Sequence, residues 1–239
     1  MKAIIVGNSG SFLNSLSGDK IDKFETVIRT NCFEIEGYEK WVGSKVDIVS
    51  FGGESPAWGL SLKRNKFRPI QEIWLKHPCG PPRISKFEKI APKKCKVRKI
   101  THYDLVFNNF PVIEEAFHSN KVKNPSTAIR TCLEAISIYG AGNVYFHGLF
   151  GRNYYCSQKI VIDSEREVFW DSIIKKDSNK LNWYKQYDLD GIDYFSENVK
   201  GEALKKYINP SSCFELNHDF NAEEKAMKFL SKKGVFLEL

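Results

Sequence analysis

Short apolar runs recur along the first 150 positions, and polar turns containing glycine or asparagine separate them. Runs bounded in this way are typical of buried β-strands. Segments with a helical spacing of apolar residues lie between several of these runs. We predict strands over 3–7, 25–29, 46–51, 71–76, 103–108 and 143–148, and helices over 33–41, 109–118 and 127–139. Strands that alternate with helices predict an α/β fold, Rossmann-like, with a mainly parallel sheet flanked by helices.

Two helices carry clear boundary signals. The helix over 127–139 follows Pro125, and either Ser126 or Thr127 can cap it. A second helix starts at 221–224 and runs to about residue 233, where Gly234 ends it. The last five residues, 235–239, predict a final strand, so the α/β pattern extends to the end of this sequence.

The length of 239 residues predicts a single domain over 1–239. Residues 63–99 are rich in proline and lysine and predict a basic, loop-rich insertion. Residues 152–210 are polar, aromatic and irregular, apart from a strand-like piece at 159–163. No apolar run approaches the ~18 residues of a spanning helix. The apolar stretch of 3–6 is too short for a signal peptide, so we interpret it as the first strand and expect a cytoplasmic protein.

The positive charge is concentrated in one range. Lys and Arg total 36 and Asp and Glu total 29, which gives +7. Residues 63–99 hold 13 basic and two acidic residues, so this range is 13 − 2 = +11 and the rest of the chain is 7 − 11 = −4. Such a range is typical of a solvated face, or of a surface toward an anionic membrane or glycan. Nucleic acid is not favoured, because no nucleic-acid-binding motif accompanies the charge.

The sequence gives little indication of a metal. The six cysteines form no Cys-x-x-Cys pair, and such cysteines are usually buried apolar residues. Cys79 and Cys95 could join His77 and His102 in a zinc site, but their spacing is not a standard one. The Asp-x-Asp triplet at 188–190 has no apolar strand before it, so we interpret it as a loop. We therefore expect neither a metal nor a cofactor.

The turn after the first strand is a candidate binding element. Gly7, Asn8, Ser9 and Gly10 follow the apolar run directly. A strand that leads into a glycine turn presents backbone N–H groups to a phosphate or ribose. The turn matches neither the dinucleotide-binding pattern nor the Walker loop, so neither NAD nor ATP is favoured. The alternative is a plain tight turn.

Two further elements carry candidate chemistry. Ser126 and Thr127 stand at a helix N-terminus, where unpaired N–H groups and a partial positive charge suit a carboxylate or phosphate. The alternative is that these residues only cap the helix. His218 stands at the entrance of the last helix, with Glu223 five positions on. A histidine there can act as a general base, although a single histidine is more often structural or exposed.

The order and the flanks of these elements resemble the sialyltransferase superfamily. The stretch 6–51, with VGNSG and Arg-Thr-Asn at 29–31, resembles the large sialyl motif. The stretch 124–151 resembles the small motif, from Pro-Ser-Thr through a helix to a strand that ends near glycine. The sequence Asn-Tyr-Tyr at 153–155 resembles the third motif. His218 and Glu223 fit the very small motif, which is His, four residues, then Glu.

The resemblance implies an inverting, metal-independent glycosyltransferase. Members transfer sialic acid from CMP-sialic acid to a glycan hydroxyl, and the CMP-sugar is the substrate rather than a cofactor. The implied fold is the sialyltransferase variant of the GT-A type, with 152–210 as an acceptor or lid segment. Our leading hypothesis for the acceptor is a lipooligosaccharide, glycolipid or capsule near the inner membrane face, with 63–99 toward anionic lipid or anionic glycan.

The resemblance also assigns roles to individual residues. Tyr154 and Tyr155 would hydrogen-bond the leaving phosphate, His218 would take the acceptor proton, and Glu223 would support the local fold. Ala128 stands where the family prefers glycine. The donor-binding residues implied by the match are Gly7, Asn8, Ser9, Gly10, Asn31, Ser126, Thr127, Ala128 and Gly148.

Three alternatives remain open from the sequence. The same fold and chemistry could serve another CMP-ulosonic acid, such as Kdo. A non-catalytic protein could keep the fold for binding nucleotide or glycan, although His218, Tyr154 and Tyr155 argue against this. A basic interaction protein could use 63–99 for nucleic acid or membrane, with the motifs as coincidence.

Overall fold

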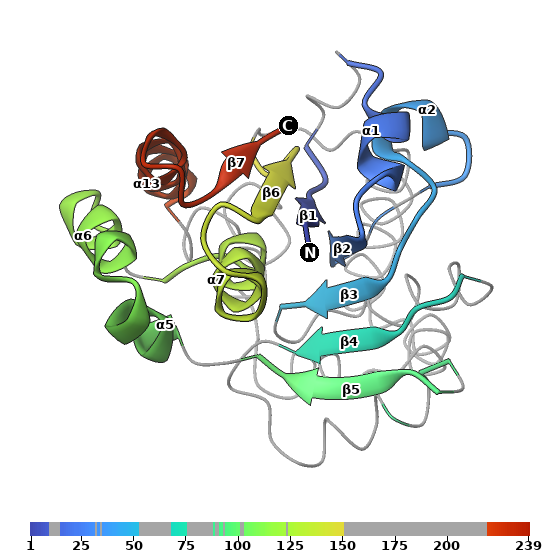
Figure 1. Ribbon diagram of the computed structural model, residues 1–239, viewed down its shortest axis with the longest axis horizontal. Coiled ribbons are helices and arrows are strands. Elements are labelled where there is room, and N and C mark those ends of the chain that lie inside the picture. The colour runs from blue at the N-terminus through green and yellow to red at the C-terminus, as the bar shows by residue number, and fades with distance from the viewer. Residues whose placement is uncertain are drawn as a thin grey trace, which may run out of the picture.

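A parallel sheet forms the centre of the computed structural model. The structure describes residues 1–9, 15–31, 33, 35–52, 68–75, 88, 91–92, 94–100, 103–122, 124–150 and 219–239. Within these ranges seven strands pair in the order β5-β4-β3-β2-β1-β6-β7, and every pairing is parallel (Figure 1). The strands are β1 (Ala3–Val6), β2 (Thr26–Thr30), β3 (Ile48–Phe51), β4 (Glu72–Leu75), β5 (Lys96–Lys99), β6 (Val144–His147) and β7 (Leu237–Glu238). The predicted Rossmann-like α/β fold is confirmed.

Helices cover both faces of this sheet (Figure 1). The helix α7 (Thr127–Tyr139) packs directly on one face, where α5 (Tyr103–Asn109), α6 (Pro111–Ser119) and α13 (Phe220–Lys232) extend the same layer. The short helices α1 (Gly18–Asp22) and α2 (Glu39–Val42) lie on the opposite face. Because side chains alternate along a strand, Ala3 and Ile5 of β1 join the core under α7, while Ile4 and Val6 join the core under α1.

Most of the predicted elements occur, and two predictions are wrong. Residues 103–108 were predicted as a strand, but 103–109 form the helix α5. Their apolar residues are consecutive, so the spacing does not distinguish the two-residue period of a strand from the helical period of about 3.6 residues. The strand of this region is instead β5, whose sequence KVRK has a single apolar residue. The helix expected over 33–41 is limited to Glu39–Val42, because Phe33 and Ile35 contribute to the core beside β3 and β4.

The basic range 63–99 contributes β4 and β5 to the sheet. Arg98 lies 2.8 Å from the buried carboxylate of Glu134 and 3.2 Å from Glu72, and its guanidinium stacks on Trp74 at 4.5 Å. Lys96 and Lys99 are exposed on the edge strand of the sheet. Charged residues on an edge strand oppose pairing with a second chain. The structure thus gives these three basic residues roles within the fold.

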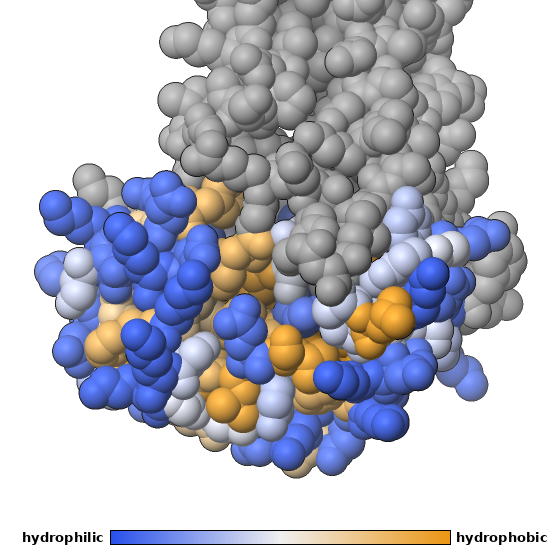
Figure 2. Space-filling view, turned by 90° about the horizontal axis from the view of Figure 1, so that it is seen from above, coloured by the Kyte–Doolittle hydropathy of each residue, from blue (hydrophilic) through white to orange (hydrophobic). Residues whose placement is uncertain are grey.

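The described surface is largely hydrophilic in the view of Figure 2, with smaller hydrophobic areas between the polar residues. The exposed large apolar side chains come from different elements: Met1, Leu16, Leu105, Ile138 and Phe220. No helix among the described residues has the length and apolar character to span a membrane.

Arg29 and Asp22 hold the turn that leads into β3. The side chain of Arg29 is fully buried, and it donates to the carbonyl oxygens of Val42 at 2.8 Å and Lys45 at 3.0 Å. Asp22 accepts hydrogen bonds from the backbone N–H groups of Ser44 and Lys45. The arginine of the Arg-x-Asn pattern therefore has a structural role, and the asparagine stands beyond the end of β2.

Substitution of Asp22 tests this turn. Burial raises the pKa of Asp22, but the hydrogen bonds from Lys45 and Ser44 and the charge of Arg29 outweigh it and lower the pKa below its ordinary value. A lowered pKa stabilises the fold above the ordinary value of about 3.9 and loses this effect as the pH falls further. Because solvent screens this half-exposed carboxylate, we expect Asp22→Asn to lower the free energy of unfolding by only about 1 kcal/mol at pH 7 and by less at pH 3.

Urea denaturation at both pH values measures this difference. Asp19→Asn is the matched control, because Asp19 is exposed on the same helix. An equal loss at pH 3 and pH 7 would contradict the assigned role of the charge.

Candidate functional site

The turns after β1 and β6 are locked together at the carboxyl edge of the sheet. The N–H of Gly7 donates to the carbonyl of His147 at 2.9 Å, and the N–H of Ser9 donates to the carbonyl of Gly148 at 2.9 Å. A Cβ on Gly7 would stand 2.1 Å from the carbonyl oxygen of Gly148, so only glycine fits at this position. The strand β1 pairs with β2, the next strand in the sequence, on one side and with β6 on the other. Ligands of open α/β sheets bind at such a reversal of strand order.

Two asparagines line the neighbouring strand ends. The Nδ2 of Asn8 donates to the carbonyl of Thr30 at 2.9 Å. The Oδ1 of Asn8 is buried, and no donor among the described residues reaches it. Asn31 has a φ of +52°, a left-handed conformation that asparagine tolerates better than most residues. The Oδ1 of Asn31 accepts a hydrogen bond from the N–H of Gly52 at 3.0 Å, so the Nδ2 donors of Asn31 point away from Gly52.

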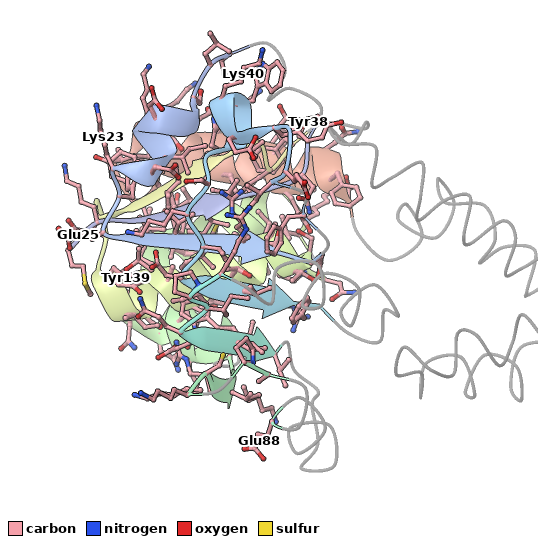
Figure 3. The ribbon with its side chains drawn as sticks, turned by 90° about the vertical axis from the view of Figure 1, so that its right-hand side faces the viewer. Lys23, Glu25, Tyr38, Lys40, Glu88 and Tyr139 are labelled. Carbon is pink, nitrogen blue, oxygen red and sulfur yellow. The ribbon has the colours of Figure 1, made fainter. Side chains whose placement is uncertain are left out.

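The first turn of α7 completes this edge. The helix runs opposite to the strands, because Tyr139 at its end lies on the same side of the molecule as Glu25, which precedes β2 (Figure 3). Its N-terminus consequently meets the carboxyl end of β3. A Cβ on Gly52 would overlap the hydroxyl of Thr127, so the strand end and the helix start are in close contact.

Ser126 caps α7 and is itself held from the far end of the chain. Its hydroxyl accepts the N–H of Ile129 at 3.4 Å. Its own N–H donates to Glu223 Oε1 at 2.6 Å, although Glu223 stands 97 positions away. The side chain of Glu223 is 1% exposed and lies in the first turn of α13, where Asp219 is the N-cap. This arrangement resembles a capping box whose acidic residue comes from another helix.

The edge is suited to an anionic ligand. The N–H groups of Thr127 and Ala128 belong to a helix start, where no intrahelical acceptor exists and the helix dipole is positive. Asn8 and Asn31 add polar groups from the two neighbouring strand ends. Such a cluster of donors binds phosphate or carboxylate groups.

His147 precedes Gly148 at the end of β6. Burial lowers its pKa, the nearby charge of Lys20 lowers it further, and a hydrogen bond with the backbone of Leu239 opposes both effects. The imidazole is therefore predominantly neutral at pH 7. It points to the face of α1, because Tyr145 and His147 share one side of β6 and Tyr145 packs in the core under α1.

The structure brings most of the sequence-predicted donor residues to one edge. Gly7, Ser9 and Gly148 are joined directly, and Asn31 is connected through Gly52 to Thr127. Asn8 lies beside Thr30, the residue before Asn31. Ala128 follows Thr127 in the first turn of α7. The predicted residues Gly10, Tyr154, Tyr155 and His218 lie outside the described residues.

Sequence reasoning missed three residues of this edge. Gly52 directly follows the predicted strand 46–51, in the same way that Gly7 follows the first strand, and this likeness could have identified it. Ser50 and Thr131 join β3 to α7 through their hydroxyls at 2.7 Å. They have no signal in the sequence, because a serine in a strand and a threonine in a helix are unremarkable alone. The described residues contain no group of three or more side chains that could hold a metal ion.

Comparison with known proteins finds a family whose sequence model matches the N-terminal part of the chain. Residues 1–70 match the sequence model of glycosyltransferase family 29 (sialyltransferase). The chain is 28% identical over 152 residues to the CMP-N-acetylneuraminate-beta-galactosamide-alpha-2,3-sialyltransferase 1 of Gallus gallus, which covers 62% of this chain and 44% of that protein. It is 54% identical over 48 residues to the beta-1,6-galactosyltransferase GALT29A of Arabidopsis thaliana, which covers 20% of this chain and 12% of that protein.

Among solved structures, a mammalian sialyltransferase in complex with Gal-beta-1-3GalNAc-ortho-nitrophenol aligns with a TM-score of 0.48 at 18% identity. The alignment covers 99% of this chain and 68% of that one.

Together the fold and the edge define an α/β protein with a candidate anion-binding site at the ends of its parallel strands. The resemblance to the sialyltransferase superfamily is confirmed, and residues 1–70 are the part that matches the sequence model of glycosyltransferase family 29. This matched range includes Gly7, Asn8, Ser9 and Asn31. The chain spans less than half the length of these two curated relatives.

Substitution of Glu223 tests the link between α13 and α7. Glu223→Gln keeps an oxygen acceptor but removes the charge, and a hydrogen bond to a charged group contributes more than one between neutral groups. We expect the free energy of unfolding to fall by about 1–3 kcal/mol, measured by urea denaturation.

The adjacent Glu224→Gln is the matched control. Glu224 forms an i,i+4 pair with Lys228 at 2.7 Å on the surface of the same helix. Such pairs contribute about 0.3–0.5 kcal/mol, so the control should be nearly neutral. Equal effects of the two substitutions would contradict the role of the buried carboxylate.

Proposed function

We propose that this protein transfers a sialic acid from CMP-sialic acid to a glycan hydroxyl, with inversion and without a metal. The observation that carries the proposal is that the segment matching the family 29 model supplies the turn at Gly7–Ser9 and Asn31, and that Asn31 is joined through Gly52 to Thr127 at the start of α7. The Gallus gallus relative is named for a CMP-N-acetylneuraminate donor, which supports the choice of donor.

The proposed site uses neutral donors to hold the anionic donor sugar. The amides of Thr127 and Ala128 receive the carboxylate or phosphate at the positive end of α7. Asn8, Ser9 and Asn31 hold the phosphate, ribose and cytidine. Helix dipoles and fixed hydrogen-bond donors stabilise a developing negative charge without rearranging, so a metal is not required for this step. Glu223 fixes the helix start by holding the N–H of Ser126.

The proposed reaction is a single displacement. The bond between the anomeric carbon and the phosphate oxygen breaks, and its electron pair leaves with CMP. The acceptor oxygen forms the new bond on the opposite face of the sugar, which inverts the configuration. His218 takes the proton of the acceptor hydroxyl, and Tyr154 and Tyr155 hydrogen-bond the departing phosphate. The transition state resembles an oxocarbenium ion, as in glycoside hydrolysis.

The contact between α13 and α7 supports the role of His218. In the sequence His218 directly precedes Asp219, the N-cap of α13. Glu223, in the first turn of that helix, binds the N-cap residue of α7. One buried hydrogen bond thus joins the helix that follows the proposed base to the helix that binds the proposed donor.

One observation favours a second candidate for the donor sugar. The Arabidopsis thaliana relative, 54% identical over 48 residues, is named a beta-1,6-galactosyltransferase. A nucleotide-activated galactose is accordingly the second candidate donor. CMP-Kdo and a non-catalytic nucleotide- or glycan-binding role are further outcomes that the same experiment separates.

Release of nucleotide tests the proposal. Purified protein is incubated in EDTA with CMP-Neu5Ac, CMP-Kdo or UDP-galactose, without and with a galactoside acceptor. We expect CMP release from CMP-Neu5Ac and transfer to the acceptor. His218→Ala should lower the rate by about 10²–10⁴, which is typical for removal of a general base.

His118→Ala is the matched control, because His118 is exposed on α6. Release from CMP-Kdo or UDP-galactose alone would change the donor but keep the enzyme class. Binding of CMP without turnover of any donor would favour the non-catalytic role. Failure to bind any nucleotide would overturn the proposal and favour a protein that binds anionic surfaces.

We also propose a cytoplasmic protein that contacts the inner membrane face through 63–99 and acts on a lipooligosaccharide, glycolipid or capsule acceptor. Each lysine near an anionic headgroup layer contributes about 1 kcal/mol. Exchanging Lys96 and Lys99 for glutamate should therefore weaken binding to phosphatidylserine-containing vesicles by about 30-fold or more, measured by cosedimentation.

The same charge change at Lys232 and Lys233, which end α13, is the control. Equal weakening by both pairs would indicate an attraction by net charge alone. Absence of binding to anionic vesicles at low salt would contradict the membrane contact.

A further inference from the structure

A ring of contacts joins the ends of β2 and β3 to the first turn of α7. The N–H of Asn31 donates to the carbonyl of Ser50 at 2.8 Å, and the hydroxyl of Ser50 lies 2.7 Å from that of Thr131. The hydroxyl of Thr131 lies 2.7 Å from the carbonyl of Thr127. The contact of Thr127 with Gly52 and the bond from Gly52 to Asn31 close the ring.

The direction of the hydrogen bonds in this ring follows from the number of protons. A hydroxyl carries one proton, and the carbonyl of Thr127 can only accept. Thr131 donates to the carbonyl of Thr127 and to the hydroxyl oxygen of Ser50, so its single proton is shared between these two acceptors. Ser50 and Thr131 are both 0% exposed, so water does not replace these bonds.

The ring acts on the groups that form the proposed donor site. A threonine that donates to the carbonyl four residues earlier bends its helix locally. Here that carbonyl belongs to Thr127, in the turn whose N–H groups face the proposed anion. The backbone of the same Ser50 fixes Asn31, the second proposed donor contact. Ser50 of β3 thus fixes the position of the first turn of α7 relative to the end of β2.

We propose that Ser50 and Thr131 are positioning residues, which set the first turn of α7 relative to Asn31 so that both reach one nucleotide phosphate or donor carboxylate. The ligand in this inference rests on the proposed function. Neither side chain touches the ligand. A purely structural role predicts a loss of stability, whereas a positioning role predicts a loss of nucleotide binding that exceeds it.

The experiment removes the hydroxyl and keeps the shape. Thr131→Val is nearly isosteric, and Thr131→Ser keeps the hydroxyl but loses the methyl group. Ser137→Ala is the matched control, because Ser137 makes the same kind of bond, to the carbonyl of Glu134, near the other end of α7. Titration calorimetry measures CMP binding, and amide exchange measures the opening of residues 127–129 without ligand.

We expect Thr131→Val to weaken CMP binding by about threefold to tenfold, the effect of one hydrogen bond. The exchange of residues 127–129 should accelerate by a similar factor. Thr131→Ser should restore both values, and Ser137→Ala should change neither. Ser50→Ala should weaken binding like Thr131→Val, and the double variant should be little weaker than either single one, because both remove the same hydroxyl contact between β3 and α7.

The outcomes separate the two proposals. If the unsubstituted protein binds no CMP but Thr131→Val still loosens residues 127–129, the proposed function fails and the positioning of α7 stands. If Thr131→Val binds CMP normally with unchanged exchange, the inference is wrong. If Thr131→Ser weakens binding as much as Thr131→Val, the methyl group rather than the hydroxyl matters, and the inference is also wrong. If Thr131→Val fails to fold, Ser50→Ala tests the same inference by the same two measurements.

Discussion

The hydrogen bond from the N–H of Ser126 to the buried carboxylate of Glu223 joins the last helix of the chain to the helix that starts the candidate site. A charged acceptor that is almost fully buried is costly unless it is hydrogen-bonded, so this contact constrains both helices strongly. It fixes where α7 begins. The position of that first turn then determines which groups of the strand ends it meets.

The candidate site is built mainly from backbone geometry. Gly7 allows its turn to approach the carbonyl of Gly148 closer than any side chain permits, and Gly52 does the same for the first turn of α7. Asn31 adopts a left-handed conformation and uses its side chain to hold the N–H of Gly52. Rigid strand ends and one helix start thereby converge without a long flexible side chain among the described contacts. Such a preorganised edge suits the binding of a charged group.

The positive charge of residues 63–99 has more than one structural explanation. Arg98 is paired with two carboxylates and stacked on Trp74, so its charge is used within the fold. Lys96 and Lys99 lie on an exposed edge strand, where charge discourages association. The excess of basic residues in 63–99 is consequently partly a property of the sheet. The proposed membrane contact uses the exposed Lys96 and Lys99 together with further charges of this range.

Much of the fold was determined by local patterns in the sequence. Short apolar runs predicted β1, β2, β3, β4 and β6, because buried parallel strands are apolar on both faces. The helix α7 begins at its predicted cap Ser126 and ends before Gly140. The turn at Gly7 and the pair at Ser126 and Thr127 were recognisable because glycine and hydroxyl residues have defined positions at strand ends and helix starts.

Tertiary structure decided the features that local patterns do not encode. The basic strand β5 was not predicted and the helix α5 was predicted as a strand, because pairing with β4 and packing against α7 override the weak periodicity of these segments. The partnership of Ser50 with Thr131 joins residues 81 positions apart, and that of Ser126 with Glu223 joins residues 97 apart. A sequence determines which residues can donate and accept, but only the folded chain brings the two partners within hydrogen-bonding distance.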